Sequence, residues 1–218
     1  NACLGFLNGM LVVANMIELG QIDTGMVVAA EDPREGQLWT IDHMRNSPPD
    51  RETLRDNLAS FTLGAASVAM ILRHKDMSRT GKRLLGGVSY SNTEHCELCV
   101  AQRMWMRTKS SALLAEGTKV VAQAWERFKG ALGWTNAMVD RLFTHQVSEP
   151  QRQVALRALD LPSEIDYPTL QFLGNTASVA APISMAIGLD NGFVKDGDRV
   201  VLSGVGSGIN SIVLGLQW

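Results

Sequence analysis

The chain has 218 residues, of which 45% are hydrophobic and 19% charged, and its formal net charge is -2. This composition excludes a disordered chain and allows one large domain or two small ones. The balance of 20 basic and 22 acidic residues argues against nucleic acid or an anionic membrane surface as the main partner. With three cysteines, no readable secretory signal and no apolar run of membrane-spanning length, we expect a cytoplasmic protein without a membrane span.

The first third of the chain predicts one helix and two strands around a polar excursion. Residues 4–19 have the pattern of a helix that is buried on nearly every side and ends at Gly20. Residues 25–30 and 64–72 are short apolar runs, typical of strands that are covered on both faces. Between them, residues 32–57 are charged and contain prolines, which indicates a surface excursion with some helix.

The remainder alternates strands with helices, which indicates α/β layering. We expect an irregular segment over residues 92–109 and a kink at Pro182, inside the last helix. The expected strands cover residues 84–91, 139–144, 198–204 and 209–216, and the expected helices cover residues 110–132, 149–159 and 175–189.

Three side chains stand at the ends of predicted elements and could carry chemistry. Cys3 is at the beginning of a helix, where free N–H groups and the helix dipole favour a thiolate; alternatively it is a small buried hydrophobe. His145 follows a strand, where it either points into a cleft at the sheet edge or bonds to the backbone. Asn175 precedes a helix and either caps it or directs an amide donor into a site.

Other motifs are weaker. The glycine-rich turn at residues 204–208 offers backbone N–H groups to a ligand, but no Lys-Ser/Thr follows it, so a Walker-type phosphate site is not expected. His95-Cys96-Glu-Leu-Cys99 supplies too few ligands for zinc and indicates a loop with two incidental thiols. The carboxylates Glu31, Asp32 and Glu35 indicate a loop at the end of a strand.

Four segments follow one another along the chain: Ala2-Cys3-Leu-Gly-Phe, Thr144-His145-Gln146, Gly174-Asn175-Thr176 and Gly204-Val-Gly-Ser-Gly208. In this order they resemble the thiolase superfamily, and more closely its ketoacyl-ACP synthase III branch, which has a Cys–His–Asn triad. Within that branch, residues 1–9, 17–22, 145–149 and 172–175 are most similar to the head-to-head acyl-CoA condensing enzymes of bacterial olefin biosynthesis.

The resemblance implies a layered αβαβα fold with two pseudo-symmetric halves, in a homodimer. Residues 1–80 would be the later part of the N-terminal half, with the nucleophile helix, and residues 81–218 the C-terminal half, with the His and Asn. The chain would then correspond to the C-terminal two-thirds of such an enzyme. A preceding segment would pack on helix 4–19, and the partner subunit would contribute a catalytic glutamate from that segment.

The resemblance also implies roles for the residues. Cys3 would take an acyl group from a fatty acyl-CoA, while the backbone N–H groups of Cys3 and Ser207 hold the oxyanion. His145 and Asn175 would hold the thioester oxygen of a second acyl-CoA, and condensation would give a β-keto acid. Apart from the coenzyme A of the substrates, no metal or cofactor is expected. Met and Leu residues around helix 4–19 would line the acyl site, and downstream olefin-pathway enzymes are possible partners.

Three alternatives remain open at the level of sequence. The first is a ketoacyl-ACP synthase III that condenses acyl-CoA with malonyl-ACP. The second is a quinolone- or polyketide-type condensing enzyme with a different acceptor. The third is a non-catalytic thiolase-fold scaffold, against which the intact Cys–His–Asn set argues.

Overall fold

The computed structural model of the protein describes residues 2–102 and 104–218. The strands are β1 (Thr24–Glu31), β2 (Ala66–Arg73), β3 (Arg83–Ser91), β4 (Cys99–Ala101), β5 (Met106–Thr108), β6 (Arg141–Thr144), β7 (Arg199–Gly206) and β8 (Asn210–Gln217). The α-helices are α1 (Gly5–Glu18), α2 (Arg34–Asn46), α3 (Arg51–Asn57), α4 (Ser110–Leu132), α5 (Glu149–Ala158), α6 (Leu170–Leu173) and α7 (Ala180–Asp190). Two short 3₁₀ turns, η1 (Ala2–Leu4) and η7 (Ala177–Val179), precede α1 and α7.

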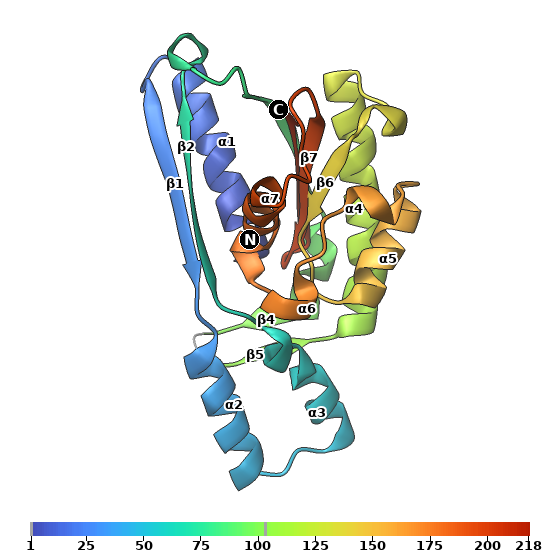
Figure 1. Cartoon of the computed structure of the whole chain (residues 1–218). Helices are drawn as coiled ribbons and strands as arrows, with labels where there is room; N and C mark the ends of the chain where they lie inside the picture. Colours follow the sequence, from blue (N-terminus) through green and yellow to red (C-terminus); the bar gives the residue numbers. More distant parts are fainter. Residues whose placement is uncertain (1, 103) are drawn as a thin grey trace.

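The elements form layers, as Figure 1 shows. The antiparallel pair β1–β2 is one outer layer, and α1 and α7 lie between it and a four-stranded sheet with the order β3-β8-β7-β6. Helices α4 and α5 cover the other face of this sheet, while α2 and α3 project beyond one end of the layers, next to the β4–β5 hairpin (Figure 1). The predicted layered α/β class is thereby confirmed.

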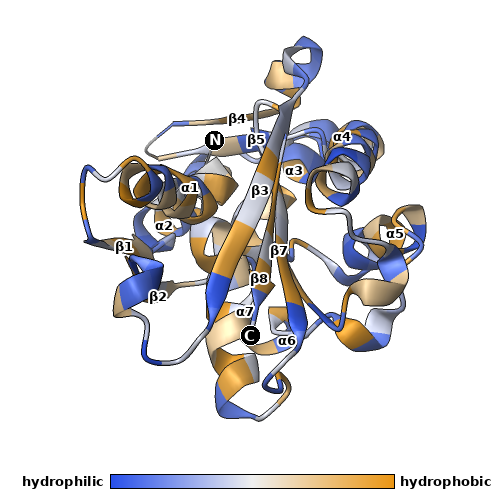
Figure 2. Cartoon of the chain, turned by 90° about the horizontal axis from the view of Figure 1, so that it is seen from above, coloured by the Kyte–Doolittle hydropathy of each residue, from blue (hydrophilic) through white to orange (hydrophobic). Residues whose placement is uncertain are grey.

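The four-stranded sheet separates two apolar clusters, because successive side chains of a strand point to opposite faces. Seen from above, α1 and α4 lie on opposite sides of this sheet (Figure 2). Toward α1 and α7 the sheet buries Phe143, Leu202 and Leu214, and toward α4 it buries the neighbouring residues Leu142, Val201 and Val213. None of the helices in the described part of the chain has both the length and the apolar character to cross a membrane.

The outer face of β1–β2 corrects the expectation that these strands are covered on both faces. Met26, Val28 and Ile71 are 62%, 59% and 59% exposed, whereas Val27 faces α1 and is buried. Helix α1 is also less enclosed than predicted, since Val12 is 55% exposed. Apolar runs alone do not distinguish one covered face from two, because the covering elements come from elsewhere in the chain or from another chain.

Three further expectations need correction. Pro182 does not kink its helix, because α7 begins only at Ala180 and the first helical turn needs no proline N–H. The glycine-rich turn is shorter than expected, since β7 continues through Gly206. The segment expected to be irregular contains the β4–β5 hairpin.

Candidate active site

His145 lies directly after β6 at the edge of the four-stranded sheet. Its backbone N–H donates to the carbonyl oxygen of Ser203 at 2.8 Å, which continues the β6–β7 ladder by one residue. Its Nε2 lies 3.1 Å from Oδ1 of Asn175. Since an amide oxygen only accepts, this bond requires a proton on Nε2. Burial lowers the pKa of His145, and the hydrogen bonds to Asn175 and the Val205 backbone oppose this more weakly. The imidazole is therefore a neutral N–H donor at pH 7.

Asn175 is fixed by its backbone and its side chain together. Its N–H donates to Thr62 O and its C=O accepts from Gly64 N–H, both at 2.8 Å, so the segment pairs with the chain that leads into β2. Its Oδ1 also accepts from the N–H of Ala177 at 2.9 Å. Asn175 does not cap a helix as considered above, because η7 begins only at Ala177. Instead it closes a local turn and presents its amide to His145.

The turn after Asn175 is strained. Ala177 has a φ of +45°, a left-handed conformation that costs a residue with a Cβ about 1–2 kcal/mol. The next residue, Ser178, donates its N–H to Oε1 of Glu31 at 3.2 Å, and its hydroxyl donates to the same oxygen. Glu31 is the last residue of β1, so this contact joins the outer sheet to the Asn175 segment.

Cys3 lies in η1, which packs against β7 and η7. A Cβ at Gly204 of β7 would lie 2.6 Å from Cδ2 of Leu4 and 3.1 Å from Cβ of His145. The turn that carries Cys3 therefore rests on β7 beside His145, and glycine is needed there because these side chains approach the strand so closely. The structure thus brings three distant segments to one place, with His145 and Asn175 in direct contact.

The pKa of the Cys3 thiol is shifted in the direction opposite to the one expected from the sequence, which was toward a thiolate. Burial, with a smaller effect from the carboxylate of Glu31, raises the pKa of the Cys3 thiol to about 11. Withdrawal from water disfavours the charged thiolate, and the neighbouring negative charge of Glu31 disfavours it further. The thiol is protonated at neutral pH, so its proton must be removed when substrate is attacked.

Ser207, the expected second oxyanion donor, lies in the short connection between β7 and β8. Its carbonyl oxygen accepts from Nδ2 of Asn210 at 3.3 Å. A Cβ at Gly206 would lie 3.2 Å from Cγ of Leu4, so this connection also adjoins the Cys3 turn. The role of its N–H group stays a prediction.

Of the remaining cysteines, Cys99 lies near Cys3: burial raises the pKa of the Cys99 thiol, and the charge of Cys3 adds to this rise. Cys96 is exposed, and Sγ of Cys99 lies 3.5 Å from Oγ1 of Thr108 across the β4–β5 hairpin. His95 pairs with Glu116 at 3.3 Å. Within residues 2–102 and 104–218, no three His, Cys, Asp or Glu side chains are placed to share a metal ion.

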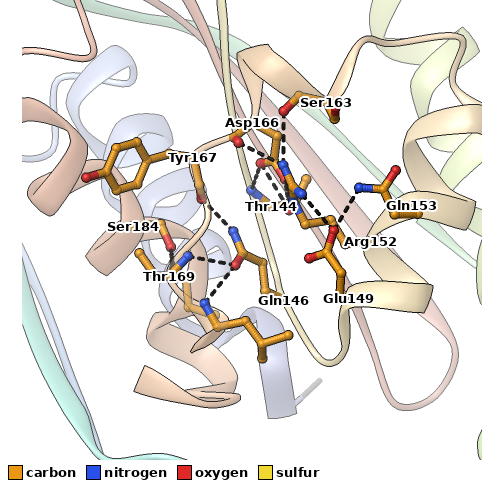
Figure 3. A network of polar contacts seen from close by, with 12 residues as sticks. Thr144, Gln146, Glu149, Arg152, Gln153, Ser163, Asp166, Tyr167, Thr169 and Ser184 are labelled. Carbon is orange, nitrogen blue, oxygen red and sulfur yellow. Dashed lines mark hydrogen bonds and ion pairs between the residues drawn. The ribbon is translucent and has the colours of Figure 1, made fainter. Parts of the chain in front are cut away.

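The two residues that flank His145 belong to a polar network (Figure 3) that the sequence did not reveal. The amide of Gln146, only 2% exposed, donates to the carbonyl oxygen of Tyr167 at 2.6 Å. Its Oε1 accepts from the N–H groups of Thr169 at 2.9 Å and Leu170 at 3.1 Å. Gln146 therefore holds the loop that leads into α6 and on to Asn175.

On the other side of His145, the network ends in a buried ion pair (Figure 3). Nε of Arg152 lies 2.5 Å from Oδ2 of Asp166, and Oδ1 of Asp166 accepts from the backbone N–H of Thr144 at 3.1 Å. Burial raises the pKa of Asp166 to about 6, and Arg152 opposes this rise. The pair fixes α5 and the loop after it to the end of β6.

We expect Arg152→Leu to lower the free energy of unfolding by about 3–5 kcal/mol, because Asp166 is left buried without its cation. Urea unfolding measures this loss. Arg157→Leu on the same helix is the control, since Arg157 is exposed and its replacement should change stability by no more than about 0.5 kcal/mol. Equal losses in the two variants would contradict a stabilising role for the pair.

An open groove adjoins the site. Its volume is about 530 Å³, and Gly174, Val147 and the 62% exposed Phe172 lie on its wall. Its complete lining is residues 61–63, 147–149 and 170–174. By contrast, Leu4, Leu7 and Met10, near which an acyl site was expected, are at most 1% exposed and pack in the core with Phe143 and Leu202.

Comparison with known proteins gives relatives over the whole chain. The family model for the C-terminal part of 3-oxoacyl-[acyl-carrier-protein (ACP)] synthase III matches residues 130–218. An acyl-CoA:acyl-CoA alkyltransferase of Shewanella oneidensis is 39% identical, over 100% of this chain and 66% of the relative. One from Xanthomonas campestris is 32% identical, over 100% of this chain and 64% of the relative.

Solved structures agree with these relatives. Cerulenin-bound OleA of Xanthomonas campestris superimposes with a TM-score of 0.96 at 32% identity, covering 100% of this chain and 63% of that one. The 3-oxoacyl-(acyl carrier protein) synthase III FabH of Xanthomonas oryzae superimposes with a TM-score of 0.95 at 32% identity, covering 100% of this chain and 64% of that one. The chain belongs to the ketoacyl synthase III family, with the thiolase-like fold.

Membership in the ketoacyl synthase III family confirms the resemblance inferred from the segments around Cys3, His145 and Asn175. The chain spans just under two thirds of the length of the curated relatives it matches, 66% and 64%. Relatives named beta-ketoacyl-[acyl-carrier-protein] synthase III, such as that of Pseudomonas aeruginosa, are more distant at 26% identity. The family's OleA-type members are therefore the nearer comparison of the two.

Proposed function

We propose that this protein is an acyltransferase that joins two fatty acyl-CoA thioesters by Claisen condensation. The observation that carries the proposal is the contact between the neutral His145 and the buried Asn175, beside the Cys3 turn. The 39% identity to a relative named acyl-CoA:acyl-CoA alkyltransferase supports acyl-CoA as both substrates.

In the first half-reaction, the sulfur of Cys3 attacks the thioester carbon of one acyl-CoA. The bond from that carbon to the sulfur of coenzyme A breaks, coenzyme A leaves, and the acyl group stays on Cys3. The N–H groups of Cys3 and Ser207 hold the oxyanion that forms in between. Because burial raises the pKa of the thiol, its proton is lost during the attack, and coenzyme A takes up a proton and leaves as the free thiol.

In the second half-reaction, the second acyl-CoA loses a proton from its α-carbon, and that carbon attacks the acyl carbon on Cys3. A carbon–carbon bond forms, the bond from the acyl carbon to the sulfur of Cys3 breaks, and Cys3 leaves as a thiolate that takes up a proton again. The enolate oxygen accepts from Nδ2–H of Asn175 and from Nε2–H of His145, which it shares with Oδ1 of Asn175; both donors are in place before the charge develops. We assign removal of the α-proton to a glutamate of the partner subunit, from a segment outside this chain. Hydrolysis of the condensed thioester gives a β-keto acid, and the reaction needs no cofactor beyond the coenzyme A of its substrates.

The substrates decide between this proposal and its alternatives. The purified protein is incubated with a long-chain acyl-CoA alone, and with acyl-CoA plus malonyl-ACP, while mass spectrometry follows coenzyme A release and the condensed product. A β-keto acid from acyl-CoA alone supports the proposal. A product only with malonyl-ACP would make the protein a ketoacyl-ACP synthase, and absence of any acyl-enzyme would make it a scaffold.

We also propose a cytoplasmic homodimer in which further polypeptide covers the exposed apolar face of β1–β2 and α1. Exposed patches of this kind mark interaction surfaces, and Met26, Val28, Ile71 and Val12 are more than half exposed. Light scattering on the purified protein should give a mass above that of one chain. Ile71→Asp should reduce that mass, and an unchanged assembly would contradict the proposal. Downstream olefin-pathway enzymes are proposed as further partners.

A further inference from the structure

Glu31 makes a contact that the proposed mechanism does not use. Its Oε1 accepts the N–H of Ser178 at 3.2 Å and also the Ser178 hydroxyl, across 147 positions of sequence. Glu31 ends β1 in the outer sheet, whereas Ser178 lies in η7, three residues after Asn175. The contact therefore joins two layers of the fold at the candidate active site.

Ser178 also adjoins the nucleophile. A Cβ at Gly5 would lie 3.7 Å from Cβ of Ser178, so Ser178 packs against the first residue of α1, two positions after Cys3. Ser178 is only 7% exposed. Its polar groups are thus withdrawn from water, and Glu31 is the acceptor that satisfies both its N–H and its hydroxyl.

The strained residue Ala177 stands between two attachments. On one side Asn175 Oδ1 accepts its N–H, and on the other Glu31 holds Ser178. A strained conformation of this kind persists only where the surrounding contacts determine it. The Glu31 contact is therefore one of the two attachments that flank the positive φ of Ala177, next to the hydrogen bond between Asn175 and His145.

We propose that Glu31 is a positioning residue for the proposed condensation. Its carboxylate holds the strained turn through Ser178, and the turn keeps the Asn175 amide hydrogen-bonded to Nε2 of His145. The inference rests on the proposed function only for its kinetic readout. The placement of Asn175 is a structural consequence that can be measured without activity.

Glu31 has a second effect that separates its charge from its hydrogen bonds. Its negative charge lies close enough to Cys3 to contribute to the raised pKa of the thiol. Glu31→Gln removes the charge but keeps an oxygen that can accept from Ser178, whereas Glu31→Ala removes both. Ser178→Ala keeps the charge and removes the hydroxyl bond. Asp32→Asn is the matched control, because Asp32 is the exposed neighbouring carboxylate and its Oδ1 accepts from the N–H of Arg34, two residues away.

We expect Glu31→Ala to condense acyl-CoA up to about 100-fold more slowly than the unmodified protein, because a small misplacement of a catalytic group can slow a reaction by this factor. Glu31→Gln should restore most of that loss, and adding Ala177→Gly to Glu31→Ala should restore part of it, because glycine adopts a positive φ without strain. Asp32→Asn should match the unmodified protein. A Glu31→Gln variant as slow as Glu31→Ala would overturn the proposal.

Two readouts do not depend on condensation. The first is the pH profile of Cys3 alkylation by iodoacetamide. Glu31→Gln and Glu31→Ala should shift thiol reactivity to lower pH, while Ser178→Ala should not.

The second is a crystal structure of Glu31→Ala. It should show a negative φ at residue 177, and Nε2 of His145 and Oδ1 of Asn175 should lie beyond hydrogen-bond distance of each other. An unmoved Asn175 would overturn the proposal even if the protein condenses acyl-CoA. If Glu31→Ala does not fold, Ser178→Ala takes its place in the condensation assay and the crystal structure, and Glu31→Gln alone serves in the alkylation profile. Failure of the unmodified protein to condense acyl-CoA, with these two results as expected, would overturn only the proposed function.

Discussion

Cys3→Ala should abolish the acyl-enzyme completely when the protein is mixed with acyl-CoA, because the proposed covalent bond forms at the sulfur of this residue. Cys3→Ser should behave in the same way. A hydroxyl is a much weaker nucleophile than a thiolate, and the His145 imidazole is hydrogen-bonded to Asn175 rather than placed as a base for residue 3. Intact mass spectrometry after a single turnover detects the acyl group directly.

Cys96→Ala is the control for the acylation experiment, since Cys96 is an exposed cysteine on the 3₁₀ segment Thr93–Leu98. It should acquire the acyl group at the rate of the unmodified protein. An acyl group that survives in Cys3→Ala would place the nucleophile elsewhere, and peptide mapping would then identify the thiol concerned.

His145→Ala and Asn175→Ala should leave Cys3 able to take an acyl group and should slow condensation by about 10²–10³-fold each. Loss of one preorganised donor to an oxyanion has this effect, equivalent to about 3–4 kcal/mol. The measurement compares a single-turnover acylation assay with a full condensation assay on two acyl-CoA molecules. His74→Ala is a suitable control, because His74 follows β2 and its ring contacts its neighbour Asp76.

The acylation rate of His145→Ala distinguishes two roles for the histidine. Because the pKa of the Cys3 thiol is raised, some group must accept its proton. If His145→Ala blocks acylation as fully as Cys3→Ala does, His145 is that acceptor and its assignment to the second substrate is wrong. Membership in the ketoacyl synthase III family would be unaffected by that result.

Local patterns determined several parts of the fold. The helical spacing of apolar residues and the glycine that follows them predicted α4, which runs from Ser110 to Leu132 and ends with Gly133 in the left-handed conformation. The strand before His145 was also predicted, although it begins two residues later than expected. Such features depend on residues within one or two turns of each other, so the sequence contains them directly. The Cys–His–Asn order along the chain is of the same kind.

Burial and long-range contacts were decided only by the tertiary structure. The apolar pattern of β1 did not show that one face of the strand stays exposed. The position of Cys3 at a helix N-terminus predicted a lowered pKa of its thiol, whereas burial raises it. The contacts of Glu31 with Ser178, and of Gln146 with the loop that leads into α6, join residues 147 and 23–24 positions apart. Desolvation and hydrogen-bond partners of this kind depend on which segments pack together, and no local pattern in the sequence specifies that.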